Sequence, residues 1–327
     1  MRFFARRISF YLATAWLALT LNFIIPRLMP GDPVQEMFAR TKQTATPQAL
    51  AAMRAAFGVD TSASLLSQYL SYLGDVLHGQ LGTSISYYPA AVSTVIGAAL
   101  PWTLFLVGTA TVISFVAGTL LGIASAWRRG SWVDHLLPVT AFLSAIPYFW
   151  LGAVAIFLFG NKLGWFPLTG AYNPGLSPGF NLPFALSALD YGVLPAGTIV
   201  VSSLAGWLLG MRNVMILTIP EDYVLLAQAK GLRSRRVIFT YAARNAILPT
   251  LASFALSLGF VVGGAILTEI VFSYPGVGYV LFQAVTNQDY PLMQGLFLTI
   301  TMMVLLANLL ADVAYAVLDP RTRESRR

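Results

Sequence analysis

Residues 211–249 read MRNVMILTIPEDYVLLAQAKGLRSRRVIFTYAARNAILP, and this stretch decides how the rest of the chain is organised. The chain is otherwise strongly apolar, but this stretch is charged throughout. Its charged side chains are Arg212, Glu221, Asp222, Lys230, Arg233, Arg235, Arg236 and Arg244. Each charge at the centre of a bilayer opposes insertion by about 2.5–3.5 kcal/mol, so this stretch is excluded as a membrane span.

The first part of the stretch predicts a short helix that ends at a glycine. Thr218 is the expected N-cap, and Glu221 follows at the spacing of a capping box. Gly231 suits the left-handed backbone position that ends a helix. Helical periodicity predicts that one face of this helix carries Tyr223, Leu226 and Ala227.

The second part predicts another helix, capped by Ser234 and running through Arg235 to Asn245. Two interpretations of the whole stretch stay open at this point. It is either an ordinary solvated loop between membrane spans or an element that docks onto a soluble partner.

The composition of the chain is that of an integral membrane protein. Of its 327 residues, 57% are hydrophobic and 10% are charged, against about 25% charged in an ordinary soluble domain. The net charge of +7 is spread over short loops and a tail, which fits anionic lipid and membrane topology better than nucleic acid.

Several sequence features of enzymes are missing from this chain, which excludes thiol nucleophiles, thiolate metal sites and disulfides. It has no cysteine, two histidines and no phosphate-binding glycine loop or catalytic serine motif. Asp134 and Asp312 lie near predicted cytoplasmic span ends and Glu269 near an outer end, so no carboxylate lies in the middle of a span. This argues against an ion-coupled carrier, which retains such groups.

Six apolar segments are long enough to cross a hydrocarbon core of about 30 Å. They are predicted at Ile8–Leu28, Leu100–Trp127, His135–Phe159, Tyr191–Leu217, Ile247–Phe272 and Leu292–Leu318. Prolines interrupt several of them, at Pro101, Pro138, Pro147, Pro195 and Pro249. Together with many small residues, these prolines favour a closely packed bundle that is able to change shape.

Residues 29–97 are too polar and broken to span, and they predict an extracytoplasmic loop with amphipathic helices. One helix is expected from Thr46 and Pro47 to Gly58. A second is expected after Ser64, ending before His78 and Gly79, with Leu65, Leu66, Tyr69, Leu70, Leu73 and Leu77 on one side. Asp75 and His78 have the spacing of a weak metal pair, for which the structural interpretation is preferred.

The basic residues orient the chain. Of the 20 Lys and Arg residues, 15 lie on the side of the membrane that holds the amino terminus. Because Lys and Arg are more frequent in cytoplasmic loops, this count predicts that both termini and the stretch at residues 212–246 are cytoplasmic. The expected organisation is a leader and first span at residues 1–28, the loop at 29–97, a five-span core at 98–318 and a cytoplasmic tail at 319–327.

Seven segments in order resemble one family, the permease subunits of bacterial ABC importers of the oligopeptide, dipeptide and nickel type. They are RLMPGDP at Arg27, GQLGTS at Gly79, DHLLPVTAFLSAIPYFWLG at Asp134, LPAGTIV at Leu194, DYVLLAQAKGLRSRRVIFTYAARNAILP at Asp222, TEIVFSYPGVGYVLFQAVTNQDYP at Thr268 and ADVAYAVLDPRTR at Ala311.

The resemblance implies an all-α membrane protein with the six-span fold of a type I ABC-importer permease and a helical extracytoplasmic insertion after the first span. It implies a bacterial inner-membrane protein whose partners are a second, similar permease, two ATPase subunits and an extracytoplasmic binding protein. ATP and magnesium would be bound by the ATPases, and this chain would hold no cofactor, metal or catalytic residue.

By resemblance, the stretch at residues 212–246 is the loop that couples to the ATPase, with its helix at Tyr223–Leu232. The implied contact residues are Tyr223, Leu226, Ala227, Ala229, Lys230, Gly231, Leu232, Arg233, Arg235 and Arg236. Small residues let a helix lie close in a groove, while the arginines hold its rim by charge.

A second hypothesis concerns an outer turn that forms a gate or a binding-protein contact. Its residues are Glu269, Tyr274, Pro275, Gly276 and Gly278. The alternative is a structural turn with a capped carboxylate. Short peptides are the first choice of substrate, nickel and oligosaccharides are alternatives, and a stand-alone channel or ion-coupled carrier is the rival class.

Overall fold

The computed structural model describes residues 2–28, 46, 48, 64–128, 130, 132–261 and 266–318, and within these ranges the chain is helical apart from turns and one isolated bridge between Thr83 and Ala91. The α-helices are α1 (Arg2–Leu28), α4 (Leu65–Leu77), α5 (Val92–Trp127), α6 (Trp132–Ala145), α7 (Tyr148–Ala155), α8 (Leu182–Thr218), α9 (Asp222–Ala229), α10 (Ser234–Arg236), α11 (Ala243–Phe260), α12 (Ile266–Val271), α13 (Val277–Thr286) and α14 (Tyr290–Leu318). Two π-helices are interposed, η1 (Ile156–Lys162) and η2 (Val237–Ala242). The predicted all-helical class is confirmed for this part of the chain.

Among the described residues, three helices are long and apolar enough to cross a membrane. These are α5, α8 and the part of α14 from Tyr290 to Leu309, and a fourth crossing is counted if α6 and the α7–η1 segment form one broken span. The apolar part of α1, Ser9–Ile25, is shorter. Apart from residues 46 and 48, the helix predicted at residues 46–58 lies outside the described ranges, and so does the carboxyl-terminal tail.

The segment predicted as one span at His135–Phe159 is broken in the middle. Helix α6 ends at Ala145, and α7 starts after Pro147 at an angle of 96°. Pro147 has an extended backbone (φ −56°, ψ 129°), and a proline disfavours the helical conformation in the residue before it. The interruption expected at Pro147 is therefore confirmed, as a break between two helices.

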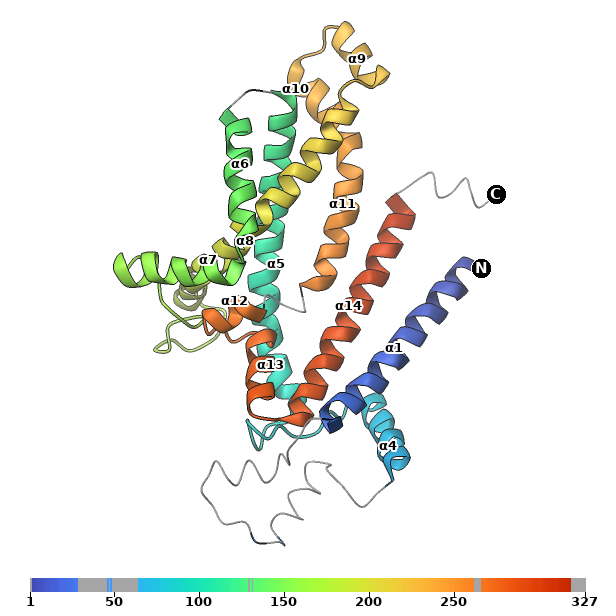
Figure 1. The fold of residues 1–327 in the computed structure, drawn as a ribbon, viewed down its shortest axis with the longest axis vertical. Helices are drawn as coiled ribbons and strands as arrows, with labels where there is room; N and C mark the ends of the chain where they lie inside the picture. The colour runs from blue at the N-terminus through green and yellow to red at the C-terminus, as the bar shows by residue number, and fades with distance from the viewer. Residues whose placement is uncertain are drawn as a thin grey trace. The chain divides into compact units, whose positions relative to one another are not determined.

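The chain divides into two compact units, Met1–Trp102 with Pro275–Leu306, and Thr103–Tyr274 with Ala307–Arg327. In the first unit α4 packs beside α1 (Figure 1). Tyr69 and Tyr72 of α4 hydrogen-bond with Thr20 (2.7 Å) and Asn22 (3.1 Å) of α1. Ser64 caps α4 as predicted, because its side chain accepts a hydrogen bond from the Ser67 N–H at 3.3 Å.

The predicted apolar face of α4 divides between two surroundings. Tyr69 and Leu73 are half-buried, whereas Leu65, Leu66, Leu70 and Leu77 are exposed. At the end of α4, His78 Nδ1 donates a hydrogen bond to the Gly74 carbonyl at 2.7 Å, so this ring nitrogen caps a carbonyl of the last helical turn.

Asp289 organises the other part of the first unit. This fully buried carboxylate accepts the Leu292 N–H at 3.1 Å and thereby caps α14. It also accepts the Ser84 hydroxyl at 2.5 Å and the Ser86 N–H at 2.8 Å. Two segments that are about 200 residues apart in the sequence are thus held by one side chain.

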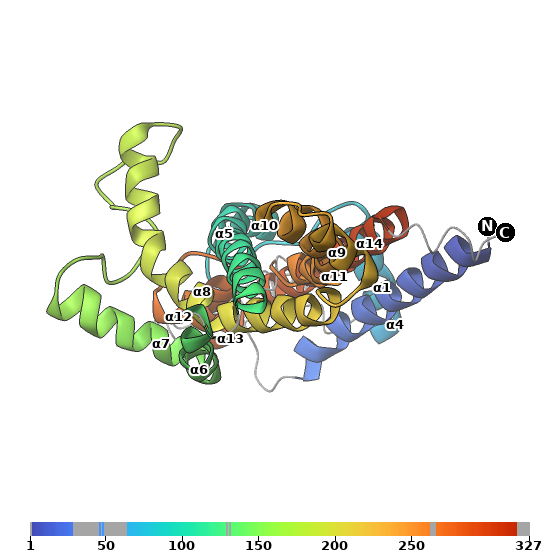
Figure 2. The ribbon, with the colours of Figure 1, turned by 90° about the horizontal axis from the view of Figure 1, so that it is seen from above.

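In the second unit, α5, α6, α8 and α11 lie alongside one another, and α9 and α10 lie at one end (Figures 1 and 2). Helices α5 and α8 approach closely at two glycines. A Cβ at Gly118 would lie 2.5 Å from the Trp207 Cβ, and one at Gly122 would lie 2.6 Å from the Leu208 carbonyl oxygen. Phe115 of α5 stacks on Phe254 of α11 with ring centroids 4.2 Å apart.

Candidate functional site

The charged stretch begins inside a helix. Helix α8 continues through Arg212 to Thr218, whose hydroxyl donates to the Val214 carbonyl at 2.8 Å. Glu221 is the N-cap residue of α9, without a side-chain capping bond. The predicted Thr218 capping box is therefore wrong. The apolar residues before Thr218 continue α8, and the helix stops only where Pro220 lacks the N–H that would extend it.

Helix α9 is held on the protein by two side chains. Val224 and Ala227 are 0% and 2% exposed. They belong to a hydrophobic cluster, here called the coupling cluster, whose other buried members are Ile123, Ala126, Met211, Met215, Val237, Ala242, Ala243 and Ala246. The cluster packs α9 against the ends of α5, α8 and α11, so a displacement of α9 is opposed by all three helices.

The end of α9 confirms the predicted glycine break. Gly231 has φ +69°, in the left-handed region, and its N–H donates to the Gln228 carbonyl at 2.9 Å. The Leu232 N–H reaches the Ala227 carbonyl at 3.4 Å. These two bonds form a Schellman motif, and Leu232 then packs against the coupling cluster.

The second helix begins one residue earlier than expected and ends much later. Arg233 is the N-cap residue and Ser234 is the first helical residue, so the predicted Ser234 cap is wrong. The chain then passes through η2 into α11 without a break at Asn245 and continues to Phe260. The expected stop at Asn245 is wrong because the next residues are apolar and extend the helix into the following span.

The outward face of this region is apolar and basic. Tyr223, Leu225 and Leu226 are 37%, 47% and 56% exposed. Leu225 was not among the predicted contact residues. Besides Tyr223 and Leu226, the predicted contact residues that are exposed are Ala229, Lys230, Gly231, Arg233, Arg235 and Arg236. The predicted common face of Tyr223, Leu226 and Ala227 is wrong, because the first two point outward and Ala227 packs inward. Exposed apolar residues beside charge are typical of a protein-binding surface.

A hollow lies next to α9. Its volume is about 450 Å³, and its lining residues come from the end of α5, the end of α8 and α9 itself: Ala126, Trp127, Ile216, Ile219, Pro220 and Gln228. Among its lining residues, Gln228 belongs to α9, so the hollow lies between this helix and the ends of α5 and α8.

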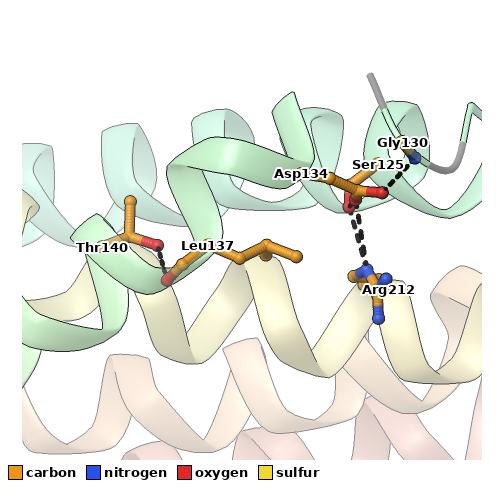
Figure 3. Close-up of polar contacts among 6 residues, drawn as sticks. All are labelled: Ser125, Gly130, Asp134, Leu137, Thr140 and Arg212. Carbon is orange, nitrogen blue, oxygen red and sulfur yellow. Dashed lines mark hydrogen bonds and ion pairs between the residues drawn. The ribbon is translucent and has the colours of Figure 1, made fainter. Parts of the chain in front are cut away.

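A polar network that the sequence did not predict joins Asp134, Ser125, Gly130 and Arg212 (Figure 3). Asp134 Oδ1 accepts the Ser125 hydroxyl at 2.5 Å, and Asp134 Oδ2 accepts the Gly130 N–H at 2.6 Å. Arg212 Nε donates to Ser125 Oγ at 2.9 Å and lies 3.7 Å from Asp134 Oδ1. The sequence offered only a weak signal, namely an acid and a base that each lie near the end of an apolar segment.

The outer turn is built around a buried carboxylate. Glu269 is fully buried and accepts the Thr103 hydroxyl at 2.8 Å, and its carbonyl accepts the Tyr274 N–H at 2.8 Å. Burial raises the pKa of the Tyr274 phenol, and the neighbouring Glu269 raises it further. This geometry argues against direct contact of Glu269 and Tyr274 with a binding protein, because neither has exposed side-chain surface.

The remaining residues of the predicted turn start the next helix. Gly276 is the N-cap residue of α13, and its carbonyl accepts the Val280 N–H at 3.0 Å. Pro275 precedes this cap and Gly278 lies in the first turn of α13. Across the ranges that the structure describes, no group of three or more His, Cys, Asp or Glu residues is placed to hold a metal ion.

Comparison with known proteins gives consistent matches over most of the chain. Residues 118–324 match the family described as binding-protein-dependent transport system inner membrane component. The chain is 35% identical to a di/tripeptide transport system permease protein of Pseudomonas aeruginosa, with 100% of both chains covered. It is 33% identical to an oligopeptide transport system permease protein of Bacillus subtilis over 92% of each chain, and 32% identical to a dipeptide transport system permease protein of Escherichia coli over 100% of each.

Proposed function

Because the chain belongs to the family of binding-protein-dependent transport system inner membrane components, we propose that it is the transmembrane permease subunit of an ABC importer for short peptides. The relatives compared above are named as permease proteins of peptide transport systems, and the match extends over their full or nearly full length. The long apolar helices supply the membrane character that this role needs.

The proposed topology has six spans with both termini in the cytoplasm of a bacterial cell. The spans are α1, α5, the broken α6–α7 element, α8, α11 with α12, and α14. The distribution of Lys and Arg supports this orientation, since 15 of 20 lie on the side of the amino terminus. The segment between α1 and α5, which includes α4, is then the extracytoplasmic insertion.

The observation that carries the functional proposal is the two-sided arrangement of α9. Val224 and Ala227 anchor the helix to the coupling cluster, and Tyr223, Leu225 and Leu226 point away from it. A helix that is held on its own protein by one face and displays an apolar face rimmed by arginines suits docking into a groove of a partner protein.

We propose that the protein that docks at this surface is an ATPase subunit. Two such subunits bind ATP and magnesium, and a second, similar permease completes the path through the membrane. ATP-driven closure of the ATPases displaces α9. The buried side chains of the coupling cluster carry that displacement to α5, α8 and α11, because a close-packed interior transmits strain.

The test is peptide uptake by the assembled transporter in proteoliposomes. Uptake is expected only with the binding protein, the second permease, the ATPases and ATP all present. ATP-independent uptake by this chain alone would support the rival channel or ion-coupled carrier instead.

The contact surface is tested separately with Leu226→Glu and the matched control Gln228→Glu on the same helix. Leu226→Glu is expected to reduce ATPase co-purification at least tenfold, because it places a charge in an apolar contact. Gln228→Glu introduces the same charge beside the hollow and is expected to cause a smaller loss. Equal, unimpaired ATPase binding by both variants would contradict the assignment of the outward face.

The proposed substrate is tested on the cognate binding protein, which selects what the permease carries. Tight binding of di- and tripeptides is expected. Tight binding of nickel or an oligosaccharide with none of peptides would replace the peptide assignment and leave the permease role intact.

For the outer turn, we propose a role in the gate, through Glu269 and Tyr274, and not in direct contact with the binding protein. The burial of both side chains supports this choice. Glu269→Gln is expected to lower the uptake rate without changing the affinity of the transporter for the loaded binding protein, and a changed affinity with unchanged rate would refute it.

A further inference from the structure

The polar network lies outside the predicted docking surface. Asp134 and Arg212 are 18% and 23% exposed and do not belong to the outward basic rim. Ser125, which lies between them, is fully buried. A partly buried charged pair with a bridging hydroxyl has fixed geometry, unlike an exposed surface pair.

The network joins three helices and one turn through the carboxylate of Asp134. Ser125 comes from the last turns of α5, Gly130 from the turn after it, Asp134 from the first turn of α6 and Arg212 from α8 (Figure 3). Both carboxylate oxygens accept hydrogen bonds, at 2.5 and 2.6 Å. The start of α6 is therefore held to both neighbouring helices.

Helix α8 connects this network directly to the coupling cluster. Arg212 follows Met211 and precedes Met215 by one turn, and both methionines are fully buried in the cluster that anchors α9. One stretch of α8 therefore contacts the docking helix through its apolar face and α6 through its charge. A displacement of α9 that moves α8 would also move the guanidinium that holds α6.

Helix α6 is bounded by two points at which the backbone departs from a helix. Gly130 has φ +75° with open space around its α-carbon, so a glycine is required there by conformation and not by crowding. At the other end α6 stops at Ala145, and Pro147 begins a 96° change of direction. Helix α6 is therefore not continuous with α5 or α7, and the network at Asp134 ties its start to α5 and α8.

We propose that Asp134 and Arg212, bridged by Ser125, are positioning residues that make the broken α6–α7 element follow the docking helix, so that ATP hydrolysis is coupled to peptide movement. The inference rests on the proposed function and adds a transmission role to residues outside the ATPase contact. Loss of the pair leaves α9 anchored and docked but releases the start of α6.

The experiment is a double-mutant cycle with Asp134→Asn, Arg212→Gln and the double variant, each in the fully assembled transporter with binding protein. Peptide uptake and ATP hydrolysis are measured on the same proteoliposomes, and ATPase co-purification is quantified. Each single variant is expected to lower the number of peptides moved per ATP at least tenfold with unchanged co-purification. The double variant is expected to be no worse than the more severe single variant, because both remove one interaction.

Arg244→Gln is the matched control, since Arg244 is an exposed arginine of the same charged stretch outside the network. It is expected to keep the wild-type ratio of peptide to ATP. Ser125→Ala provides a variant that keeps both charges, and its ratio is expected to fall about threefold or more. If the charge variants do not assemble, a wild-type ratio in Ser125→Ala overturns the proposal.

Three results would overturn the inference: unchanged coupling in both single variants, losses that multiply in the double variant, or loss of ATPase co-purification in parallel with uptake. The last result would move the pair into the docking surface. Failure of the proposed function is a different observation, because the wild-type transporter itself would then move no peptide or would need no ATPase.

Discussion

Replacement of Gly231 by alanine isolates the backbone geometry at the end of the docking helix. Gly231 has φ +69°, and a Cβ added there would meet no heavy atom within 4 Å. The cost of alanine is therefore backbone strain alone, about 1–2 kcal/mol for an L-residue in the left-handed conformation. If α9 has to keep its Schellman end to dock, this cost appears as about 5- to 30-fold weaker binding of the ATPase.

The assay is titration of the purified ATPase onto nanodiscs that hold this chain and the second permease. Gly231→Asn is expected to bind with intermediate affinity, because asparagine tolerates the left-handed region better than alanine. Gly74→Ala is the control, since Gly74 lies inside α4 with open space around it. Binding of Gly231→Ala within twofold of the wild-type affinity would refute the view that the helix end has to be preformed.

Three further outcomes test the packing and the two faces of α9. Gly122→Leu is expected to prevent assembly of the folded permease, because a Cβ at this position would lie 2.6 Å from an α8 carbonyl oxygen. Size-exclusion chromatography measures the assembly. Gly97→Ala is the control and should elute like the wild type, because no heavy atom lies within 4 Å of a Cβ at Gly97. Asp289→Ala removes the α14 cap and leaves buried donors without an acceptor, for an expected stability loss of about 2–4 kcal/mol, seen as a lower Tm. An unchanged Tm would show that neither bond contributes. Val224→Asp buries a charge and should lower the Tm of the permease. Leu226→Asp places its charge on the exposed face and should leave the Tm unchanged while weakening ATPase binding. The opposite pattern would contradict the assignment of one inward and one outward face to α9.

Two features that depend on a single residue, the helix end at Gly231 and the helix cap at Ser64, were predicted correctly. Gly231 was identified as a left-handed helix end because few other residues adopt φ +69° at low cost. Ser64 was identified as a cap because its hydroxyl acts within one turn of α4. The apolar segments now seen in α5, α8 and α14 followed from hydropathy, which depends on composition and not on the path of the chain.

Helix ends were predicted less well where two local signals compete. Thr218 has the sequence of an N-cap, but apolar residues before it favour continuing α8, and the helix continues. The prediction that Tyr223, Leu226 and Ala227 share one face of α9 was also wrong. An eight-residue helix has too few positions for its periodicity to identify one face, and the choice of Val224 over Tyr223 follows from the position of Met211 and Met215.

By itself, therefore, the sequence determined that this is an apolar, helical membrane protein with a charged segment in which a helix ends at Gly231, because those properties are set by composition and by local backbone preference. The tertiary structure alone decided that Asp134 meets Arg212 and Ser125, and that Asp289 holds the segment at residues 84–86. These contacts join residues up to about 200 positions apart, and sequence spacing carries no information about such distances. Only the packing of the helices brings the partners within hydrogen-bonding reach.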